Sequence, residues 1–199
     1  MPRQARSGDR RLLAAAVDAA RRLEPEGLVV GTVGNVSVRT GPTIHVTPTR
    51  TAYADMHERD LVMVDVAAGV SLGAGTPSRE LPLHLAIYRA RPDAVAVVHT
   101  HSPAATAWSF LGEPLGPELE DLAYYGIGSI RTAVPAPPGT DELAANVVTA
   151  IGDSRAVLLG DHGVLTLGTT PEDALTVARV VEHQAKVAWY LRSGAAPGA

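Results

Sequence analysis

The stretch Ala94–Pro103 reads AVAVVHTHSP and decides how this chain is interpreted. Its first five residues are small or β-branched and apolar, which is typical of a buried strand. His99 and His101 follow one residue apart, where that strand ends. Because side chains at i and i+2 of a strand point to the same face of a sheet, we predict a strand over residues 94–100 whose two imidazoles project together.

Two imidazoles at this spacing suit one divalent metal ion, which binds histidine nitrogen at about 2.0–2.1 Å. His162 is a third candidate, because it lies in a turn between the apolar strands 156–160 and 163–168. Three histidines with an open fourth position are typical of a catalytic zinc site. From the spacing of His99 and His101 alone, a metal site and a purely structural role are about equally supported. Structural roles are predicted for the other histidines, His45, His57, His84 and His183.

Glu80 is the candidate acid–base residue. It follows the loop GAGTPSR at 73–79 and lies in the first turn of a helix predicted over 79–90, with Ser78 as its N-cap. A carboxylate at this place either strengthens the cap or takes part in chemistry, and the sequence leaves both open. The segments GNVS (34–37) and TPTR (47–50) offer small polar groups that suit an anion pocket, although turns use the same residues for local reasons.

The remaining pattern predicts helices and strands in an order that favours a layered α/β/α domain. Several strands follow one another without an intervening helix, so the central sheet is expected to be mostly antiparallel. We predict one domain over residues 1–199, with a flexible leader (1–8) and a flexible tail (194–199). Further helices are expected at 9–24, 103–111 and 140–151 and from Pro171 onward, and further strands at 31–40, 43–48 and 61–66 and near 70–72 and 127–133.

Composition excludes several classes of protein. No segment approaches the roughly 20 apolar residues that a membrane helix needs, so no membrane partner is expected. The 17 Lys and Arg against 21 Asp and Glu give a net charge of -4 without a basic stripe, which disfavours nucleic acid. The absence of cysteine removes thiolate ligands and favours a cytoplasmic location. Lys186, the single lysine, lies in the C-terminal helix, a poor position for Schiff-base chemistry.

Four segments together resemble the class II aldolase/adducin family, which includes L-fuculose-1-phosphate aldolase and L-ribulose-5-phosphate 4-epimerase. They are GTVGNVSVR, TPT, PSRELPLHLAIYRARPDAVAVVHTHSP and LLGDHG, and the similarity runs from about residue 9 to residue 192. The resemblance implies a three-layer α/β/α domain that assembles as a homotetramer, with active sites at subunit interfaces. It also implies a small-molecule substrate, either a sugar phosphate or a hydroxy or oxo acid.

The resemblance also assigns roles to residues. His99, His101 and His162 fall on the family's metal ligands, usually for Zn²⁺, with Fe²⁺, Mn²⁺ and Co²⁺ as alternatives. Glu80 falls on its general acid/base. Two positions depart from the aldolase pattern, since Arg50 replaces a glycine and Arg79 a serine, and arginine pairs with carboxylate as readily as with phosphate. The implied substrate-binding residues are therefore Asn35, Thr49 and Ser78, together with Arg50 and Arg79.

The expected activity is a metal-dependent carbon–carbon lyase. It would cleave a small hydroxy-carbonyl substrate with an anionic phosphate or carboxylate group in a retro-aldol reaction, through an enediolate. One alternative on the same fold is a decarboxylase, or an iron-dependent oxidative decarboxylase, of a carboxylate-bearing substrate. A second is a non-catalytic adducin-like assembly domain, which the intact set of histidines and Glu80 disfavours because a scaffold does not need them.

Overall fold

The computed structural model describes residues 7–116 and 119–194. Within these ranges seven strands form one sheet, in the order β3-β2-β1-β4-β7-β6-β5. Neighbouring strands are antiparallel except β5 and β6. The strands are β1 (Asn35–Thr40), β2 (Thr43–Val46), β3 (Val62–Asp65), β4 (Ala96–Thr100), β5 (Arg131–Ala133), β6 (Ala156–Leu159) and β7 (Gly163–Gly168).

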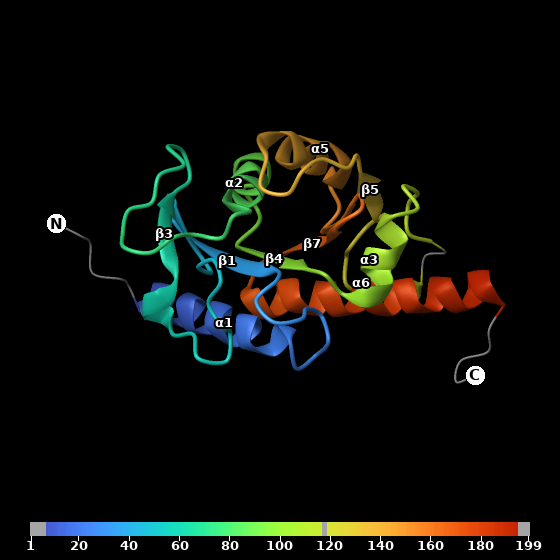
Figure 1. Cartoon of the computed structure of the whole chain (residues 1–199), viewed down its shortest axis with the longest axis horizontal. Coiled ribbons are helices and arrows are strands. Elements are labelled where there is room, and N and C mark those ends of the chain that lie inside the picture. The colour runs from blue at the N-terminus through green and yellow to red at the C-terminus, as the bar shows by residue number, and fades with distance from the viewer. Residues whose placement is uncertain (1–6, 117–118, 195–199) are drawn as a thin grey trace.

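Helices cover both faces of this sheet (Figure 1). α2 and α5 pack on one face, and α1, α3 and α6 pack on the other. The predicted three-layer α/β/α fold with a mostly antiparallel sheet is confirmed. The helices are α1 (Ser7–Leu23), the 3₁₀ turn η1 (Glu58–Asp60), α2 (Leu81–Ala90), α3 (Pro103–Ser109), α4 (Glu120–Tyr124), α5 (Asp141–Ile151) and α6 (Pro171–Ser193).

The central strand β4 is buried on both faces, which explains its continuous apolar run. Val97 packs in the core beneath α2 and α5, whereas Ala96 and Val98 pack in the core beneath α1 and α6. By the two-residue period of a strand, His99 therefore points to the α2 face. β1 is arranged in the same way: Val36 and Val38 belong to the α1 core, so Asn35 and Ser37 also face α2.

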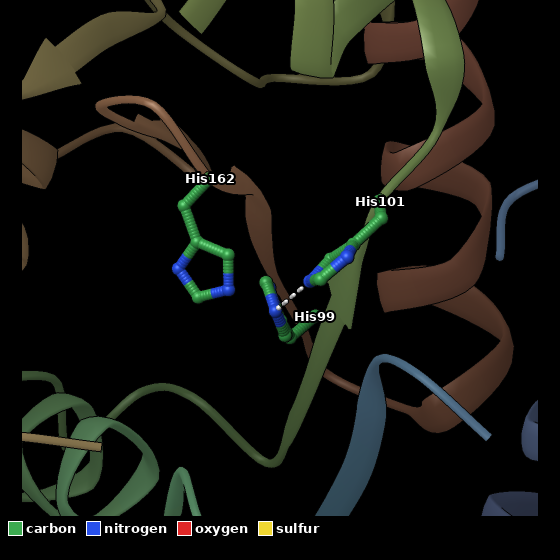
Figure 2. A group of neighbouring side chains, drawn as sticks. All are labelled: His99, His101 and His162. Atoms are coloured by element: carbon green, nitrogen blue, oxygen red, sulfur yellow. Dashed lines mark hydrogen bonds between the residues drawn. The ribbon is translucent and has the colours of Figure 1, made fainter. Parts of the chain in front are cut away.

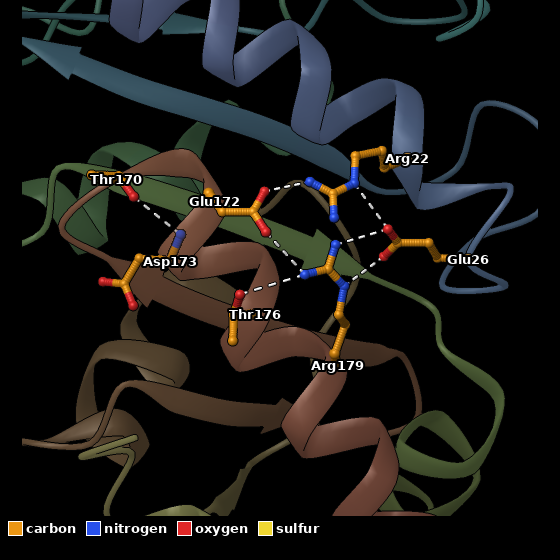
Figure 3. Close-up of polar contacts among 7 residues, drawn as sticks. All are labelled: Arg22, Glu26, Thr170, Glu172, Asp173, Thr176 and Arg179. Carbon is orange, nitrogen blue, oxygen red and sulfur yellow. Dashed lines mark hydrogen bonds and ion pairs between the residues drawn. The ribbon is translucent and has the colours of Figure 1, made fainter. Parts of the chain in front are cut away.

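Two helix starts agree with the sequence and one does not. The Thr140 and Thr170 hydroxyls cap α5 and α6 by accepting hydrogen bonds from backbone N–H groups, and Figure 3 shows the cap at Thr170. The predicted cap at Ser78 is wrong. α2 begins at Leu81, and Glu80 is its N-cap with a non-helical φ of -91° and ψ of 19°. The Ser78 hydroxyl instead accepts a hydrogen bond from the Glu80 N–H.

The strand predicted near 70–72 is reduced to one isolated bridge between Val64 and Ser71. Val70 and Leu72 are about half exposed, so this segment lacks the burial that holds the other strands in the sheet. α1 starts at Ser7, earlier than predicted. Of the predicted leader and tail, only Ser7 and Gly8 in α1 and Gly194 after α6 are described; residues 1–6 and 195–199 lie outside the described ranges. No helix in the described ranges is long and apolar enough to cross a membrane.

Candidate active site

The sheet places His99 at the centre of the candidate site. It is fully buried and lies directly opposite Asn35 of β1 and Leu165 of β7. Its Nδ1 lies 2.8 Å from the carbonyl oxygen of Val164. Because a carbonyl only accepts hydrogen bonds, Nδ1 carries a proton, and Nε2 is the atom that faces the other histidines.

Three imidazoles converge at one point although they come from different segments (Figure 2). The ring centroids of His99 and His101 lie 4.8 Å apart, and each lies 4.9 Å from the centroid of His162. One nitrogen from each ring lies within 4.8 Å of the others, so the three residues could hold a metal ion. His162 reaches this point from the predicted turn between β6 and β7, where Asp161 has a φ of 57°.

The carboxylate of Glu80 lies against the same point. Its Oε2 is 3.0 Å from His99 Nε2, and its Oε1 is 3.4 Å from His162 Nε2. Asn35 Nδ2 donates a hydrogen bond of 2.9 Å to Oε2, whereas Oε1 is buried without a hydrogen-bond partner. Glu80 immediately precedes Leu81, the first residue of α2. Its side chain therefore turns toward β1 and β4 instead of lying along the helix.

These contacts fit a bound cation. With Nδ1 of His99 protonated, the lone pair of Nε2 faces Glu80 Oε2 and His101 Nε2, each 3.0 Å away. Acceptor atoms packed this closely repel one another unless a proton or a metal ion lies among them. Imidazole nitrogen with carboxylate oxygen is a donor set that zinc and other divalent transition metals accept. The residues present therefore fit a divalent metal ion.

The electrostatics of the cluster point the same way. Burial raises the pKa of Glu80, but the adjacent His99 outweighs this and holds that pKa below its usual range. Burial lowers the pKa of His99, and Glu80 reverses the shift and raises it. Burial, reinforced by charge on His99, lowers the pKa of both His101 and His162 to about 4. Those two rings are neutral at neutral pH, so their lone pairs are available to a metal.

A pocket of about 300 Å³ opens beside this cluster. Every predicted site residue except His99 lines it, and His99 lies buried beneath. The pocket also takes in Thr32 and Val33, which sequence patterns did not single out, and Gly34 and Pro48, which belong to the two polar segments that they did. The predicted residues along its wall are Asn35, Thr49, Arg50, Ser78, Arg79, Glu80, His101 and His162.

Two guanidinium groups in this pocket lack a protein partner. Arg50 and Arg79 are exposed, and neither makes a hydrogen bond or an ion pair within the part of the chain that the structure describes. Arg50 also has a φ of 58°, in the left-handed region that suits glycine. The backbone at residue 50 thus keeps a conformation typical of glycine while it carries a cation into the pocket.

Asn35, Thr49 and Ser78, all predicted to bind the substrate, differ in how far their side chains are free to contact a ligand. The Asn35 side chain is almost completely buried, and its Nδ2 already donates to Glu80, which leaves one amide hydrogen for a ligand. Thr49 is exposed on the pocket wall, and Ser78 binds the Glu80 backbone through its hydroxyl. Substrate binding by these residues stays a prediction.

His84 is the site-proximal residue that sequence patterns missed. Its Nε2 is hydrogen-bonded to Asn35 Oδ1, so it lies two hydrogen bonds from Glu80. A signal was present, because His84 follows Glu80 by four residues in a predicted helix, a spacing that brings two side chains to one face. Lys186 does not line the pocket; it is exposed on α6 and pairs with Glu182 at 3.4 Å.

Comparison with known proteins identifies this arrangement. Residues 14–189 match the family described as Class II Aldolase and Adducin N-terminal domain. The chain belongs to this family. Among the relatives of this class II aldolase-family chain is the 5-methylthioribulose-1-phosphate/5-deoxyribulose-1-phosphate aldolase of Rhodospirillum rubrum. The two are 38% identical over 173 residues, which cover 87% of this chain and 78% of the relative.

Two further similar proteins are both named as L-fuculose phosphate aldolases. The L-fuculose phosphate aldolase of Haemophilus influenzae is 37% identical over 176 residues, which cover 88% of this chain and 80% of that protein. A solved structure of L-fuculose 1-phosphate aldolase superposes with a TM-score of 0.85 at 30% identity, covering 97% of this chain and 90% of that one. This member of the class II aldolase family is an enzyme, a metal-dependent lyase of the aldolase type.

Proposed function

We propose that this enzyme binds Zn²⁺ through His99, His101 and His162 and cleaves a carbon–carbon bond of a small phosphorylated ketose by a retro-aldol reaction. The convergence of three imidazoles and one carboxylate beside an open pocket carries this proposal. The relatives are named for substrates of this class, ketose phosphates with one anionic end. Fe²⁺, Mn²⁺ and Co²⁺ suit the same donor set and are compared with Zn²⁺ in the experiment below.

A cation held by these histidines would supply positive charge that stabilises the negative charge developing on a substrate oxygen. The protein's own part is the proton transfer, which we assign to Glu80. Its Oε2 is held by Asn35, whereas its Oε1 is buried with no hydrogen-bond partner. Oε1 is therefore the atom that exchanges a proton with the substrate as the carbon–carbon bond breaks.

The anionic end of the substrate is assigned to the wall that carries Arg50 and Arg79. Thr49 and Ser78 add hydroxyl groups to the same wall. Two unpaired guanidiniums in one pocket attract an anion strongly, and each can bind it through two N–H groups. Cationic side chains on this wall let the substrate enter with its phosphate outward and its carbonyl end toward the histidines.

The test is turnover of L-fuculose 1-phosphate and 5-deoxyribulose 1-phosphate, measured as aldehyde release, before and after complete metal removal. We expect activity to disappear with the metal and to return on addition of Zn²⁺ or of one of the three competing ions. Reaction mixtures without protein are the control for slow, non-enzymatic cleavage, and Glu80→Gln protein with full metal content shows how much cleavage the metal supports without the assigned acid/base. Activity that survives verified metal removal would exclude this function.

Decarboxylation is the second candidate, and the unpaired Arg50 and Arg79 favour it. Guanidinium binds carboxylate in the same two-pronged geometry as phosphate. A panel of 3-oxo acids, assayed for carbon dioxide with and without oxygen and with Fe²⁺ as well as Zn²⁺, separates the two candidates. Carbon dioxide release without cleavage of any ketose phosphate would replace the first proposal with this one.

The assembly and location of the enzyme are also proposals. A homotetramer is expected from the family resemblance, and light scattering of the purified protein measures it directly. The absence of cysteine favours a reducing compartment, consistent with a cytoplasmic enzyme.

A further inference from the structure

A row of buried polar side chains runs from the interior of the α2 layer to Glu80. Asn35 and Ser37 of β1 face α2, and α2 presents His84 and Tyr88 to them. His84 and Ser37 are completely buried, and Tyr88 is 2% exposed. None of these three lines the pocket, so none of them contacts a substrate. Buried polar groups in a layer that is otherwise apolar need a reason.

The hydrogen bonds in this row have only one consistent direction. An ionised carboxylate accepts only, so Asn35 must turn its amide nitrogen to Glu80 and its Oδ1 to His84. Oδ1 also accepts only, so His84 Nε2 must carry a proton and donate it. Burial, reinforced by charge on His99, lowers the pKa of His84 to about 3, so the ring is neutral and its Nδ1 is an acceptor.

The remaining two bonds follow from the same logic. Ser37 Oγ lies 2.6 Å from His84 Nδ1 and must donate its single hydrogen there. Tyr88 OH lies 3.0 Å from Ser37 Oγ and 3.4 Å from the carbonyl oxygen of Val95, so its hydrogen is donated to Ser37 over the shorter of the two contacts. Burial raises the pKa of Tyr88, so it keeps its proton. Each donor in the series Tyr88, Ser37, His84 and Asn35 therefore points toward Glu80.

We infer that His84 is a positioning residue for Glu80: as the tautomer protonated on Nε2, it locks the Asn35 amide so that its N–H holds Glu80 Oε2 and leaves Oε1 free. Without His84, Asn35 Oδ1 has no donor and Glu80 alone orients the amide, so the amide is free to rotate away from the carboxylate. Glu80 Oε2 would then lose its hydrogen bond, and the carboxylate would rotate. This inference rests on the proton-transfer role proposed for Glu80.

The matched test compares His84→Gln with His84→Met in the metal-loaded enzyme. Glutamine can donate to Asn35 and accept from Ser37, whereas methionine fills a similar volume without either hydrogen bond. We expect His84→Met to lower kcat by roughly 10- to 100-fold, with metal content and KM unchanged, because supporting residues of metal sites have effects of this size. His84→Gln should recover most of that loss.

His45→Gln is the control. His45 is a partly buried histidine of β2, and its Nε2 is hydrogen-bonded to the Thr40 hydroxyl outside this row. It should keep the wild-type kcat. A His84→Gln variant that is no better than His84→Met, or a folded, metal-loaded His84→Met variant with wild-type kcat, would overturn the inference.

A second readout is independent of activity. In protein labelled with ¹⁵N-histidine, the His84 ring should show a protonated Nε2 and an unprotonated Nδ1 at neutral pH, with His84→Gln identifying its signals. Ser37→Ala should keep Nε2 protonated, because Asn35 Oδ1 still requires a donor, and this variant keeps the test valid if His84→Met fails to fold. A protonated Nδ1 in the wild type contradicts the inference. Wild-type protein with the expected tautomer but no aldol cleavage would instead contradict the proposed function alone.

Discussion

Gly163 lies against His99 with no room for a side chain between them. A Cβ at Gly163 would lie 3.2 Å from His99 Cε1, 3.1 Å from His101 Cδ2 and 2.5 Å from the carbonyl oxygen of Thr100. β4 and β7 approach each other closely at the histidine cluster because this residue has no side chain. The turn itself places its positive φ at Asp161, so close approach is the reason for glycine here.

We predict that Gly163→Ala destabilises the fold by about 1–3 kcal/mol and lowers metal affinity, because a backbone carbonyl cannot move away as a side chain can. Thermal unfolding and bound-metal analysis measure the two effects. Gly73→Ala is the control, since a Cβ at Gly73 meets nothing within 4 Å. Equal metal content in both variants would show that the histidine cluster tolerates the displacement.

Substitutions at Glu80 and at His101 should distinguish a loss of proton transfer from a loss of metal binding. Glu80→Gln keeps the shape and one acceptor oxygen, so we expect retained metal and a loss of about 10²–10⁴-fold in kcat, the usual scale for general acid–base catalysis. His101→Ala should lose metal and activity together. Metal content by elemental analysis alongside kcat distinguishes these outcomes. A Glu80→Gln enzyme with wild-type turnover would remove Glu80 from the proposed mechanism.

We predict that Arg50 lowers the stability of the fold and strengthens the binding of an anionic substrate. A non-glycine residue in the left-handed region costs about 1–2 kcal/mol, so Arg50→Gly should leave stability unchanged or raise it by up to about 1 kcal/mol. The same variant should raise KM for an anionic substrate, with less effect on kcat. Denaturant unfolding and steady-state kinetics with phosphate and carboxylate substrates test both parts. A variant that is more stable and has an unchanged KM would assign Arg50 no part in binding.

The fourth prediction concerns the contact between α6 and the end of α1 (Figure 3). Arg179 donates to both carboxylate oxygens of Glu26, through Nε and Nη2, at 2.7 Å each. Glu172 joins the cluster by pairing with Arg22 and Arg179. The hydrogen bond from Arg179 is the main reason that the pKa of Glu26 lies below its usual value of 4.5.

A lowered folded-state pKa means that this pair stabilises the fold above pH 4.5, and that the stabilisation is lost as the pH falls through the folded-state value. Glu26→Gln should therefore cost up to about 1 kcal/mol at pH 7, and the difference from wild type should shrink in acid. Urea unfolding at several pH values measures it. In an Arg179→Gln background the pH dependence of the same substitution should be smaller but not absent, because Arg22 Nε still donates to Glu26 Oε1 at 2.9 Å. An unchanged pH dependence would show that Arg179 is not the main partner of Glu26.

Local sequence patterns predicted much of the site because its signals are local. The i, i+2 spacing of His99 and His101 after a buried strand fixes a shared face wherever the strand lies. The starts of α5 and α6 were predictable, because the Thr140 and Thr170 hydroxyls that cap them bond to a backbone N–H only three residues away. Ser78 failed as a cap, because Glu80 turns toward β1 and β4, and contacts with distant strands are invisible in a helix pattern.

The sequence by itself determined that successive side chains of β4 point to opposite faces of the sheet and that His99 and His101 offer imidazole nitrogens as metal ligands. It also determined the family to which the chain belongs. Only the tertiary structure decided that His162 meets those donors, that Arg50 has a left-handed backbone, and that His84 and Ser37 extend the site into the α2 layer. The physical reason is sequence separation. The bonds from Asn35 to Glu80 and from Ser37 to His84 join residues 45 and 47 positions apart, and only strand register and helix packing bring such residues together.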